Sequence, residues 1–311
     1  MKILFLDTAH EVIRQEMEDK GYQCEFWDGK TPVASIAKNY IGFIVRSKIK
    51  IDKAIIDSAE NLKFIGRVGA GMENIDMAYA KTKGIKVFNS PEGNRDAVGE
   101  HAMGMLLSLM NNMRRADAEV RKGIWKREEN RGTEIKGKTV GIIGYGNMGT
   151  AFAQRLQGFE CNIIAFDKYK KGFGNALVAE VDYETIYRET DILSLHVPLT
   201  NETSQLVNAE YINRFHKPIW LINTARGPVV NTEALLNALN SAKVKGAALD
   251  VLEFEKFSFE NLDKVPETFK QLADHNRVIL SPHIAGWTHE SNRKLSEIMA
   301  NKIITTFNLQ R

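Results

Sequence analysis

The stretch Lys138–Asp167 constrains the fold of this chain more than any other. It contains an apolar run at Val140–Ile143, the glycine pattern GYGNMG, a helix-compatible segment and a second apolar run that ends at Asp167. This order predicts a strand, a tight turn, a helix and a second strand followed by an acid. It is the order of a nucleotide-binding unit in an α/β protein.

Each part of this motif has a chemical reason. Gly144 makes the tight turn, Gly146 lets the backbone approach a pyrophosphate, and Gly149 lets the helix pack closely on the strand. The helix N-terminus offers free N–H groups and a positive dipole end to the phosphates. Asp167 can accept hydrogen bonds from the hydroxyls of an adenosine ribose. The motif therefore predicts a bound dinucleotide rather than a glycine turn without a ligand.

Length and composition leave room for two soluble domains. The chain has 311 residues, with 43% hydrophobic and 26% charged residues and a formal net charge of +3. Basic residues gather between Arg114 and Lys138, but acids are mixed among them. That mixture favours a solvated or subunit-contact surface over a nucleic-acid site.

The cysteines and the N-terminus predict the compartment. Cys24 and Cys161 are far apart in sequence and have no metal-ligand spacing, which predicts buried thiols in a reducing compartment and no metal site. The first apolar run reaches Asp7 too early for a signal peptide, and no run approaches the roughly eighteen apolar residues of a membrane helix. We expect a cytoplasmic protein without a membrane partner.

Short apolar runs alternate with helical patterns through the first part of the chain. The expected strands are 3–6, 24–27, 41–45, 64–66 and 87–88, and the expected helices are 11–20, 53–58 and 77–83. Alternation of this kind predicts parallel strands in a doubly wound sheet. The first part is therefore expected to form a small α/β domain of its own.

The pattern repeats after a long helix. Asp96–Asn112 is apolar at helical spacing, so its methionines are expected in a core, and Gly123–Gly137 reads as an exposed arm. Strands are then expected at 140–143, 163–166, 192–196, 219–222, 247–249 and 278–280, with helices at 150–156, after 208 and at 232–240, a variable loop to about 276, and a last helix at 290–307. The fold class is α/β, with two doubly wound parallel-sheet domains.

Polar or turn residues follow the strands of the second domain. They are Gly144, Asp167, Pro198, Arg226, Asp250 and His283, each directly after a different expected strand or within a few residues of it. In an open parallel sheet, ligands bind at the carboxyl ends of the strands. These six positions are therefore expected to lie along one edge.

Three of the residues in this region match the needs of a nicotinamide reaction. An arginine such as Arg226 can bind a substrate carboxylate through two hydrogen bonds. A histidine such as His283 can give a proton to a carbonyl oxygen or take it back. A carboxylate can orient that imidazole, and Glu255 is the candidate, although Glu253 and Glu260 are nearby carboxylates in the same charged loop.

Sequence motifs distributed over nearly the whole chain match those of one protein family. The sequence resembles the D-isomer-specific 2-hydroxyacid dehydrogenases, and within that family it looks most like the phosphoglycerate dehydrogenases. The matching motifs are VRSKIKI at 45–51, GRVGAGMENID at 66–76, NSPEGNRDAVGEHA at 89–102, GIIGYGNMG at 141–149, HVPLT at 196–200, INTARG at 222–227, ALDVLEFE at 248–255 and SPHIAGWT at 281–288.

The resemblance implies roles for individual residues. Arg226 would bind the substrate carboxylate and carbonyl, His283 would be the acid/base and Glu255 its partner. Substrate contacts are implied for Arg46, Ser47, Val68, Gly69, Ala70, Asn94 and Arg226. Cofactor contacts are implied for Gly144, Gly146, Asn147, Met148, Gly149, Asp167, Val197, Pro198, Thr224, Ala225, Asp250, His283 and Gly286, with Asp250 bonded to the nicotinamide carboxamide.

The resemblance also implies a domain arrangement and a partner. A Rossmann cofactor domain, residues 97–285, would be inserted in a flavodoxin-like substrate domain formed by residues 1–96 and 286–311. The implied partner is a second copy of the chain, because family members usually form homodimers through the arm and helices of the cofactor domain. The implied small-molecule partner is a 2-hydroxy or 2-keto acid.

This sequence departs from the family pattern in three places. Ile49 replaces the usual threonine, and the flanking Lys48 and Lys50 fit either a phosphorylated substrate or a solvated loop. The sequence ends at Arg311, so feedback control through a C-terminal regulatory domain is not expected. The lysines at 168, 170 and 171 suit a ribose 2′-phosphate, but Asp167 would repel one, which favours NAD.

Three functions are consistent with these residues. The leading one is an NAD-dependent dehydrogenase of a small D-2-hydroxy acid that resembles 3-phosphoglycerate dehydrogenase. A hydroxypyruvate or glyoxylate reductase would use the same three residues, and the motifs do not separate the two. A binding protein that senses NAD(H) without catalysis is the alternative from another class, and the joint presence of Arg226, Glu255 and His283 weighs against it.

Overall fold

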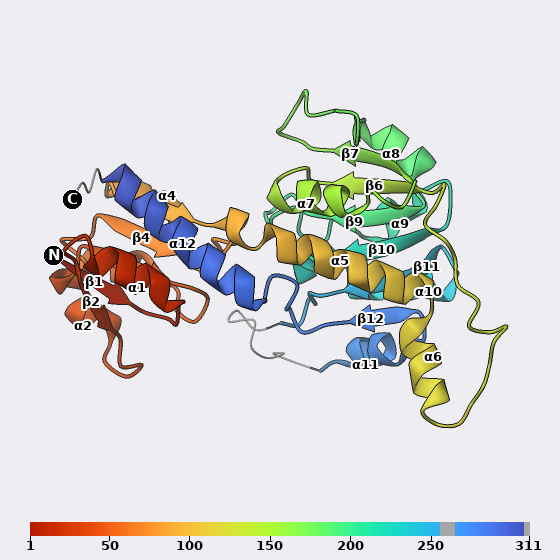
Figure 1. Cartoon of the computed structure of the whole chain (residues 1–311), viewed down its shortest axis with the longest axis horizontal. Coiled ribbons are helices and arrows are strands. Elements are labelled where there is room, and N and C mark those ends of the chain that lie inside the picture. Colours follow the sequence, from red (N-terminus) through yellow and green to blue (C-terminus); the bar gives the residue numbers. More distant parts are fainter. Residues whose placement is uncertain (256–264, 308–311) are drawn as a thin grey trace. The chain divides into compact units, whose positions relative to one another are not determined.

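The computed structural model describes residues 1–255 and 265–307, and its chain divides into two compact units (Figure 1). The first unit consists of the described residues of Met1–Asn94 and Trp287–Arg311, and the second of those of Arg95–Glu255 and Leu262–Gly286. Each unit is built around its own parallel sheet.

The sheet of the first unit has five parallel strands in the order β2-β1-β3-β4-β5. This is the flavodoxin-like order, which places a switch point between β1 and β3. The strands are β1 (Lys2–Phe5), β2 (Gln23–Phe26), β3 (Gly42–Val45), β4 (Phe64–Arg67) and β5 (Lys86–Asn89).

Helices cover both faces of this sheet, and each face has its own apolar core. The helices are α1 (Glu11–Glu18), α2 (Val33–Ile36), α3 (Lys53–Ser58), α4 (Met77–Thr82) and α12 (His289–Thr306), with short 3-10 turns η1 (Ala37–Asn39) and η2 (Pro91–Gly93). One core includes Phe43 and Ile65, and the other joins Ile3 and Phe64 to Met299 of α12. Since buried apolar side chains alternate on both faces of the strands, the sheet must be covered twice.

The sheet of the second unit has seven parallel strands in the order β12-β11-β10-β9-β6-β7-β8. The six strands from β8 to β11 have the Rossmann order, which reverses between β6 and β9, and β12 is added beside β11. The strands are β6 (Thr139–Ile143), β7 (Asn162–Phe166), β8 (Ala179–Glu180), β9 (Ile192–Leu195), β10 (Ile219–Asn223), β11 (Val244–Leu249) and β12 (Val278–Leu280).

The second sheet also lies between two layers of helices (Figure 1). They are α5 (Arg95–Met110), α6 (Met113–Val120), α7 (Asn147–Arg155), α8 (Tyr183–Glu189), α9 (Ala209–Asn213), α10 (Thr232–Asn240) and α11 (Glu267–Asp274), with the 3-10 turn η3 (Gly227–Val229). Leu106 of α5 and Phe152 of α7 pack in one core, and Leu235 of α10 packs in the other. The predicted fold class, α/β with two parallel sheets, is confirmed.

Several local expectations were wrong. The helix expected at Asp96–Asn112 ends at Met110, because Asn112 has a left-handed backbone with φ of 53° and a new helix, α6, begins after it. The variable loop before Asn276 contains α11, whose only fully buried residue is Leu272, so its apolar signal was weak. The small helices α2 and α8 and the short strand β8 were also missed.

Two smaller observations concern membrane-spanning helices and the thiols. Within residues 1–255 and 265–307, no helix combines the length and apolar character that a bilayer crossing requires. Cys24 and Cys161 are free and half-buried rather than fully buried as expected. Burial raises the pKa of the Cys24 thiol to about 11, so this thiol is protonated at neutral pH.

Candidate active site

The carboxyl edge of the second sheet gathers the six positions that follow its strands. Because these strands are all parallel, their carboxyl ends meet at one edge. The residues at this edge are Gly144 after β6, Asp167 after β7, Pro198 after β9, Arg226 after β10, Asp250 after β11 and His283 after β12.

The three glycines of the turn have different surroundings. A Cβ atom on Gly149 would lie 2.1 Å from the Gly144 carbonyl oxygen, and one on Gly144, where φ is +90°, would lie 2.5 Å from the His196 oxygen. By contrast, a Cβ on Gly146 would meet no atom within 4 Å. Gly144 and Gly149 are thus required by the protein itself, whereas Gly146 leaves its side of the turn open to an approaching group.

The turn leads directly into an uncapped helix. α7 begins at Asn147, and Gly146 at its N-cap provides no side-chain hydrogen bond to the first turn. The first N–H groups of a helix lack partners within the helix, and the helix dipole is positive at that end. Together with the open side of Gly146, these groups fit the pyrophosphate of a dinucleotide.

Asp167 is tied to the glycine turn. Its Oδ2 accepts a hydrogen bond from the Tyr145 N–H at 2.8 Å, and its Oδ1 accepts from Tyr169 and Lys170, each at 2.9 Å. Burial alone would raise the pKa of this carboxyl group, but the three N–H groups and the Lys170 charge lower it. Asp167 is therefore a half-buried anion beside the turn.

The three lysines after Asp167 are engaged with protein groups. The Lys168 ammonium pairs with Glu202, and Lys170 Nζ donates to the Tyr145 carbonyl at 3.2 Å. Lys171 Nζ donates to the Asp167 carbonyl oxygen at 3.2 Å. A ribose 2′-phosphate would have to compete with these contacts and with the Asp167 charge, which agrees with the preference for NAD.

His196 supports the turn as a neutral side chain. Its Nε2 lies 2.8 Å from Ser194 Oγ, its Nδ1 is buried, and its backbone N–H donates to Ile143 at 2.8 Å. Burial lowers the pKa of His196 to about 3, so the ring does not carry a charge near neutral pH. Val197 and Pro198 continue from it along the edge.

The Arg226 loop is shaped by a buried asparagine. Asn223 is fully buried; its Oδ1 accepts from the Ala225 N–H and its Nδ2 donates to the Arg226 carbonyl oxygen, both at 3.0 Å. The Thr224 Oγ1 within this loop is buried and has no partner among the described residues. The asparagine thus turns the chain sharply at the end of β10.

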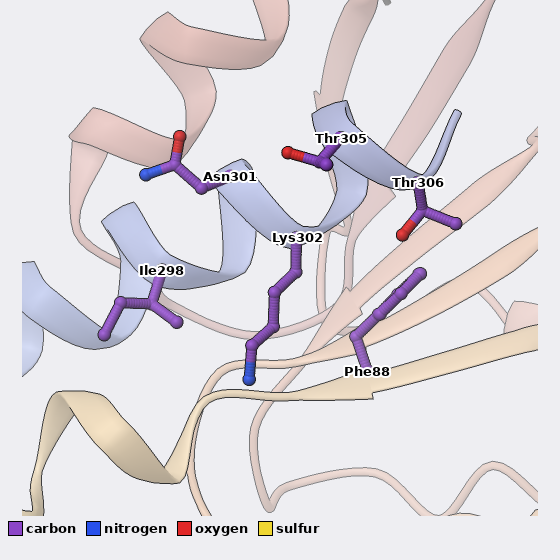
Figure 2. A pocket seen from close by; sticks show the side chains of 6 residues that line it. All are labelled: Phe88, Ile298, Asn301, Lys302, Thr305 and Thr306. Carbon is purple, nitrogen blue, oxygen red and sulfur yellow. The ribbon is translucent and has the colours of Figure 1, made fainter. Parts of the chain in front are cut away.

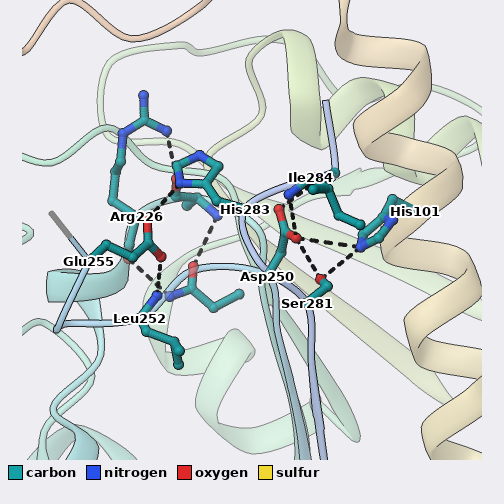
Figure 3. Close-up of polar contacts among 11 residues, drawn as sticks. His101, Arg226, Asp250, Leu252, Glu255, Ser281, His283 and Ile284 are labelled. Atoms are coloured by element: carbon teal, nitrogen blue, oxygen red, sulfur yellow. Dashed lines mark hydrogen bonds and ion pairs between the residues drawn. The ribbon is translucent and has the colours of Figure 1, made fainter. Parts of the chain in front are cut away.

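A second close approach brings this loop against the one that carries Glu255. A Cβ on Gly227 would lie 1.9 Å from the Leu252 carbonyl oxygen, so only glycine allows the two backbones to touch. The half-buried Arg226 side chain bonds through Nη1 to the Ala225 carbonyl oxygen at 2.6 Å. Arg226 therefore stands directly next to the contact between the two loops (Figure 3).

His283 and Glu255 form a hydrogen-bonded pair. The distance from His283 Nδ1 to Glu255 Oε2 is 2.7 Å, and the side chains are 22% and 13% exposed. Glu255 Oε1 accepts from the Leu252 N–H, which fixes the carboxylate (Figure 3). With Nδ1 bonded to Glu255, the other ring nitrogen, Nε2, is the one that can exchange a proton with a substrate.

The two alternative carboxylates for this pairing differ from Glu255. Glu253 accepts hydrogen bonds from the Thr232 N–H at 2.7 Å and from Gln205 Nε2 at 2.6 Å, so it joins loops and caps α10. Glu260 lies outside the described residues. Among the described carboxylates of this loop, Glu255 is the one that contacts His283.

Asp250 is more enclosed than its implied role requires. It is only 1% exposed, and its Oδ1 accepts from Ser281 Oγ at 2.5 Å and from the Ile284 N–H at 2.9 Å. Its Oδ2 accepts from the Ala285 N–H at 2.8 Å. These bonds fix the loop around His283, and a bond from Asp250 to a nicotinamide carboxamide stays a prediction.

Sequence reasoning missed two members of this network. His101 of α5 lies with its Nε2 2.9 Å from Ser281 Oγ and 3.5 Å from Asp250 Oδ1 (Figure 3). His101 stands in a mostly apolar helix and Ser281 directly follows a strand, and 180 positions separate them in the chain. No local pattern could have connected these two residues.

In the first unit, the loop after β3 carries Arg46 and Ser47. The Asn74 side chain donates to the Arg46 carbonyl oxygen at 2.7 Å, and Asp7 Oδ2 accepts from the Ser47 N–H at 3.2 Å. The Arg46 guanidinium lies 4.3 Å from the ring centroid of Trp287. Burial lowers the pKa of Arg46, with Asp7 opposing the shift, yet the guanidinium stays charged near neutral pH.

The loop after β4 contains Val68, Gly69 and Ala70, and lies beside the Arg46 loop because β3 and β4 are paired. Ser90 donates its N–H to the Gly69 oxygen at 2.9 Å, and Asn89 Nδ2 donates to the Ala70 oxygen at 2.8 Å. Gly69 has φ of +154°, and a Cβ there would collide with the Arg67 guanidinium.

Asn94, the last predicted substrate contact, has a buried Oδ1 without a partner among the described residues. It directly follows η2 and is the last residue of its segment of the first unit. Its support of the site from a hinge region stays a prediction.

The first unit also has a pocket that none of the predicted residues line (Figure 2). Its volume is about 490 Å³, and Lys302 lies in it. The Lys302 ammonium already donates to both Glu92 oxygens and to the Asn89 carbonyl oxygen at 2.9 Å. The lining residues are Phe88, Ile298, Asn301, Lys302, Thr305 and Thr306. Its cation is satisfied internally, so the pocket adds nothing to the chemistry of the strand edge.

Comparisons with known proteins agree with this geometry. Residues 103–285 match the model of the D-isomer specific 2-hydroxyacid dehydrogenase, NAD binding domain. The chain is 38% identical over 260 residues to a hydroxypyruvate reductase of Thermotoga maritima, covering 84% of this chain and 82% of that protein. It is 34% identical over 308 residues to a D-3-phosphoglycerate dehydrogenase of Archaeoglobus fulgidus, covering 98% of this chain.

The fold has matches among solved structures as well. A crystal structure of D-lactate dehydrogenase from Aquifex aeolicus, in complex with NAD and lactic acid, superposes with a TM-score of 0.83 and 28% identity. The match covers 99% of this chain and 95% of that one. By contrast, the chain spans only 57% of the length of the Archaeoglobus phosphoglycerate dehydrogenase.

Proposed function

This chain belongs to the D-isomer-specific 2-hydroxyacid dehydrogenase family, and we propose that it transfers a hydride between NAD and a small D-2-hydroxy acid or its 2-keto acid. The second unit carries the NAD-binding domain of that family. In this proposal the second unit binds the cofactor and supplies the acid/base, and the first unit contributes substrate contacts.

The observation that carries the proposal is the His283–Glu255 pair at the edge that also holds the open glycine turn. A hydrogen-bonded histidine and carboxylate can move a proton, and the uncapped N-terminus of α7 can hold a pyrophosphate. A protein that only sensed the nucleotide would need the second feature and not the first. The pair therefore favours catalysis over binding alone.

In the direction of reduction, His283 Nε2 donates a proton to the substrate carbonyl oxygen, and in oxidation it takes the proton from the hydroxyl group. Glu255 holds Nδ1 and keeps the ring in one orientation. Arg226 pairs with the substrate carboxylate and polarises the carbonyl group. NAD, when bound, accepts or supplies the hydride.

Several groups position the cofactor in this proposal. The backbone of Asn147, Met148 and Gly149 faces the pyrophosphate, and Asp167 accepts from the ribose hydroxyls. Val197, Pro198, Thr224, Ala225 and Gly286 complete the wall beside the nicotinamide. The structure supports this through the common strand edge of their loops.

We propose that the substrate carries a second polar or anionic group, and that Arg46 recognises it. Arg46 is half-buried and stacked on Trp287, and no ion pair of its guanidinium occurs among the described residues. A partly desolvated cation of this kind favours an anion. The exposed Lys48 and Lys50 next to it add positive charge, which suits 3-phosphoglycerate. Hydroxypyruvate or glyoxylate is the alternative substrate.

One panel of assays tests these proposals. NADH oxidation is measured with hydroxypyruvate, glyoxylate and pyruvate, and NAD reduction with 3-phosphoglycerate. If the substrate is phosphorylated, Arg46→Ala should raise the KM for that substrate at least tenfold, about 1.4 kcal/mol. The KM for glyoxylate should change much less. Equal KM changes for both substrates would contradict recognition of a second anionic group by Arg46.

Variants of the central residues test the reaction class itself. His283→Ala should lower kcat by about 10² to 10⁴, and Arg226→Ala should lower kcat/KM for every 2-keto acid. The control is His216→Ala, which changes an exposed histidine of the same unit. Turnover of every substrate at the wild-type rate by His283→Ala would rule out the proposed acid/base.

We also propose that two copies of the chain associate through the α6 region. α6 has no buried residue, and Met113, Val120 and Trp125 are 56%, 50% and 77% exposed. Such a run of exposed apolar side chains marks a contact surface. Sedimentation should show that the wild type is a dimer. The double variant Val120→Ser/Trp125→Ser should form a weaker dimer. A monomeric wild type would contradict the proposal.

A further inference from the structure

The loop that carries His283 has an unusual backbone and an unusual anchor. His283 has φ of +56°, a left-handed conformation that a residue with a side chain adopts only when the surrounding structure enforces it. Three consecutive N–H groups, those of His283, Ile284 and Ala285, all donate to Asp250, at 2.8, 2.9 and 2.8 Å. Asp250 accepts them with its carbonyl oxygen, Oδ1 and Oδ2, in that order.

The anchor continues from Asp250 to another element. Ser281 Oγ lies 2.5 Å from Asp250 Oδ1, 2.9 Å from His101 Nε2 and 3.8 Å from Met105 Sδ. A hydroxyl group has one proton, and the carboxylate is a much stronger acceptor than a thioether sulfur, so Ser281 donates to Asp250 and accepts from His101. This assigns the tautomer with the proton on Nε2. The donors then run in one direction, from His101 through Ser281 to Asp250.

The hydrogen bonds from His101 through Ser281 to Asp250 are buried at the Asp250 end and anchored in a helix at the His101 end. The Asp250 side chain is not exposed, and the His101 side chain is 25% exposed. His101 belongs to α5, a helix of 16 residues that packs on α7 and on β11. Through Ser281, His101 thus ties the orientation of the Asp250 carboxylate to α5. The orientation of the His283 loop depends on α5 in the same way.

We propose that His101 is a positioning residue, which acts through Ser281 and Asp250 to hold the His283 loop in its left-handed conformation. Its contribution to turnover rests on the proposed function of His283, while its effect on the loop does not. Without the His101 donor, the Ser281 hydroxyl can rotate away from Asp250, and the carboxylate loses one of the bonds that fix it. The loop then samples conformations in which His283 no longer holds its ring against Glu255.

The direct test measures amide hydrogen exchange in the cofactor-free protein. His101→Leu removes the donor and keeps an apolar side chain of similar size, and His101→Gln offers an N–H near the position of Nε2. We expect His101→Leu to speed exchange at Ile284 and Ala285 by roughly tenfold or more, and His101→Gln to restore much of the protection. The matched control, His216→Leu, makes the same replacement at an exposed site and should leave these amides unchanged.

Kinetics with the best keto acid of the panel supplies the second readout. His101→Leu should lower kcat roughly tenfold to a hundredfold with little change in the KM for NADH, and His101→Gln should recover most of kcat. If His101 only filled space, His101→Gln would not have a higher kcat than His101→Leu. Equal kcat values for the two variants would therefore overturn the proposal.

The exchange measurement separates this proposal from the proposed function. If no keto acid is reduced but the loop amides respond to His101→Leu as expected, the positioning role stands and the reaction class is wrong. If the wild type is active and His101→Leu leaves exchange at Ile284 and Ala285 unchanged, the positioning role is wrong. Urea unfolding of each variant shows whether a change in exchange is local or reflects global stability.

Discussion

Two loops of the second unit, one after β7 and one after β11, are organised by aspartates in the same structural position. Asp167 accepts three backbone N–H groups and ties its own loop to the glycine turn. Asp250 likewise accepts three, two through its carboxylate and one through its carbonyl oxygen, and ties its strand to the His283 loop. Both residues follow a strand of the same parallel sheet.

The two aspartates differ in exposure. Asp167 is half-buried and can still accept hydrogen bonds from a ribose, whereas Asp250 is 1% exposed and its carboxylate is occupied by protein donors. An ionised carboxylate offers about four acceptor positions, so a ligand can share one only where it can reach the oxygens. The same residue type at the same edge is thus open to a ligand in one loop and is an enclosed loop anchor in the other.

The largest effect that separates the two aspartates is expected from Asp250→Ala. It removes the acceptor of the buried Ala285 N–H, of the part-buried Ile284 N–H and of the Ser281 hydroxyl, at about 1 to 3 kcal/mol for each group left unsatisfied. We expect a loss of at least about 3 kcal/mol in the free energy of unfolding, measured in urea. A loss below about 1 kcal/mol would mean that Asp250 does not anchor the loop.

The glycine turn allows a matched comparison on the Asp167 side. Gly149→Ala places a Cβ 2.1 Å from a backbone oxygen, so the turn must shift, and we expect a loss of about 2 to 3 kcal/mol in stability. Gly146→Ala meets no atom within 4 Å and should leave stability nearly unchanged. It should instead weaken NADH binding, measured by fluorescence titration, because the methyl group stands where the pyrophosphate approaches. Equal stability losses in both variants would contradict the assignment.

The pH dependence of stability tests the support beneath the turn. The pKa of His196 is lowered to about 3 in the folded state, compared with 6.5 for an ordinary histidine. The unfolded chain therefore takes up a proton that the folded one refuses as the pH falls below 6.5, and stability is lost between pH 6.5 and 3.

From pH 7 to pH 5 we expect His196 to account for a loss of about 1 to 2 kcal/mol, the lower value allowing for the partial exposure of the residue. Urea unfolding of the wild type and of His196→Gln at both pH values measures this contribution as the difference between their pH dependences. The same pH dependence in both proteins would show that His196 is not the group responsible.

The smallest effect is expected from Asp167→Ala. Two of its three N–H partners, those of Tyr169 and Lys170, belong to exposed residues and can bond to water, so the change in stability should be smaller than in Asp250→Ala. The Kd for NADH should rise about tenfold, or 1.4 kcal/mol, and the preference for NADH over NADPH should fall. If NADH binding is unchanged while stability drops as far as in Asp250→Ala, the distinction between the two aspartates is lost.

The features that sequence reasoning found are those with local patterns. Alternating apolar runs predicted both parallel sheets, and the spacing of the glycines predicted the turn before α7. The rule that polar residues follow parallel strands placed Arg226 and His283 at one edge. In each case the signal lies within a few residues of the feature, so pattern and propensity are sufficient.

What could not be predicted depends on contacts between distant residues. His101 meets Ser281 across 180 positions, and neither stands in a pattern that marks a hydrogen bond. Glu253 and Glu255 are equivalent in sequence, and only the approach of Gly227 to Leu252 and the cap on α10 separate their roles. The burial of Asp250 could not be predicted from sequence either, because it depends on the packing of β11 and β12 against α5.

The position of α12 has a consequence for the order in which the protein can fold during synthesis. One core of the first sheet contains Leu295, Met299, Ala300 and Ile303 of this helix together with Ile3, Phe5 and Phe64. The ribosome must make all of the second unit between these two sets of residues, which takes on the order of tens of seconds. Through that time this core has its α1 side chains, Ile13 and Met17, but lacks those of α12. The nascent chain therefore presents an apolar surface that a ribosome-associated chaperone would be expected to bind.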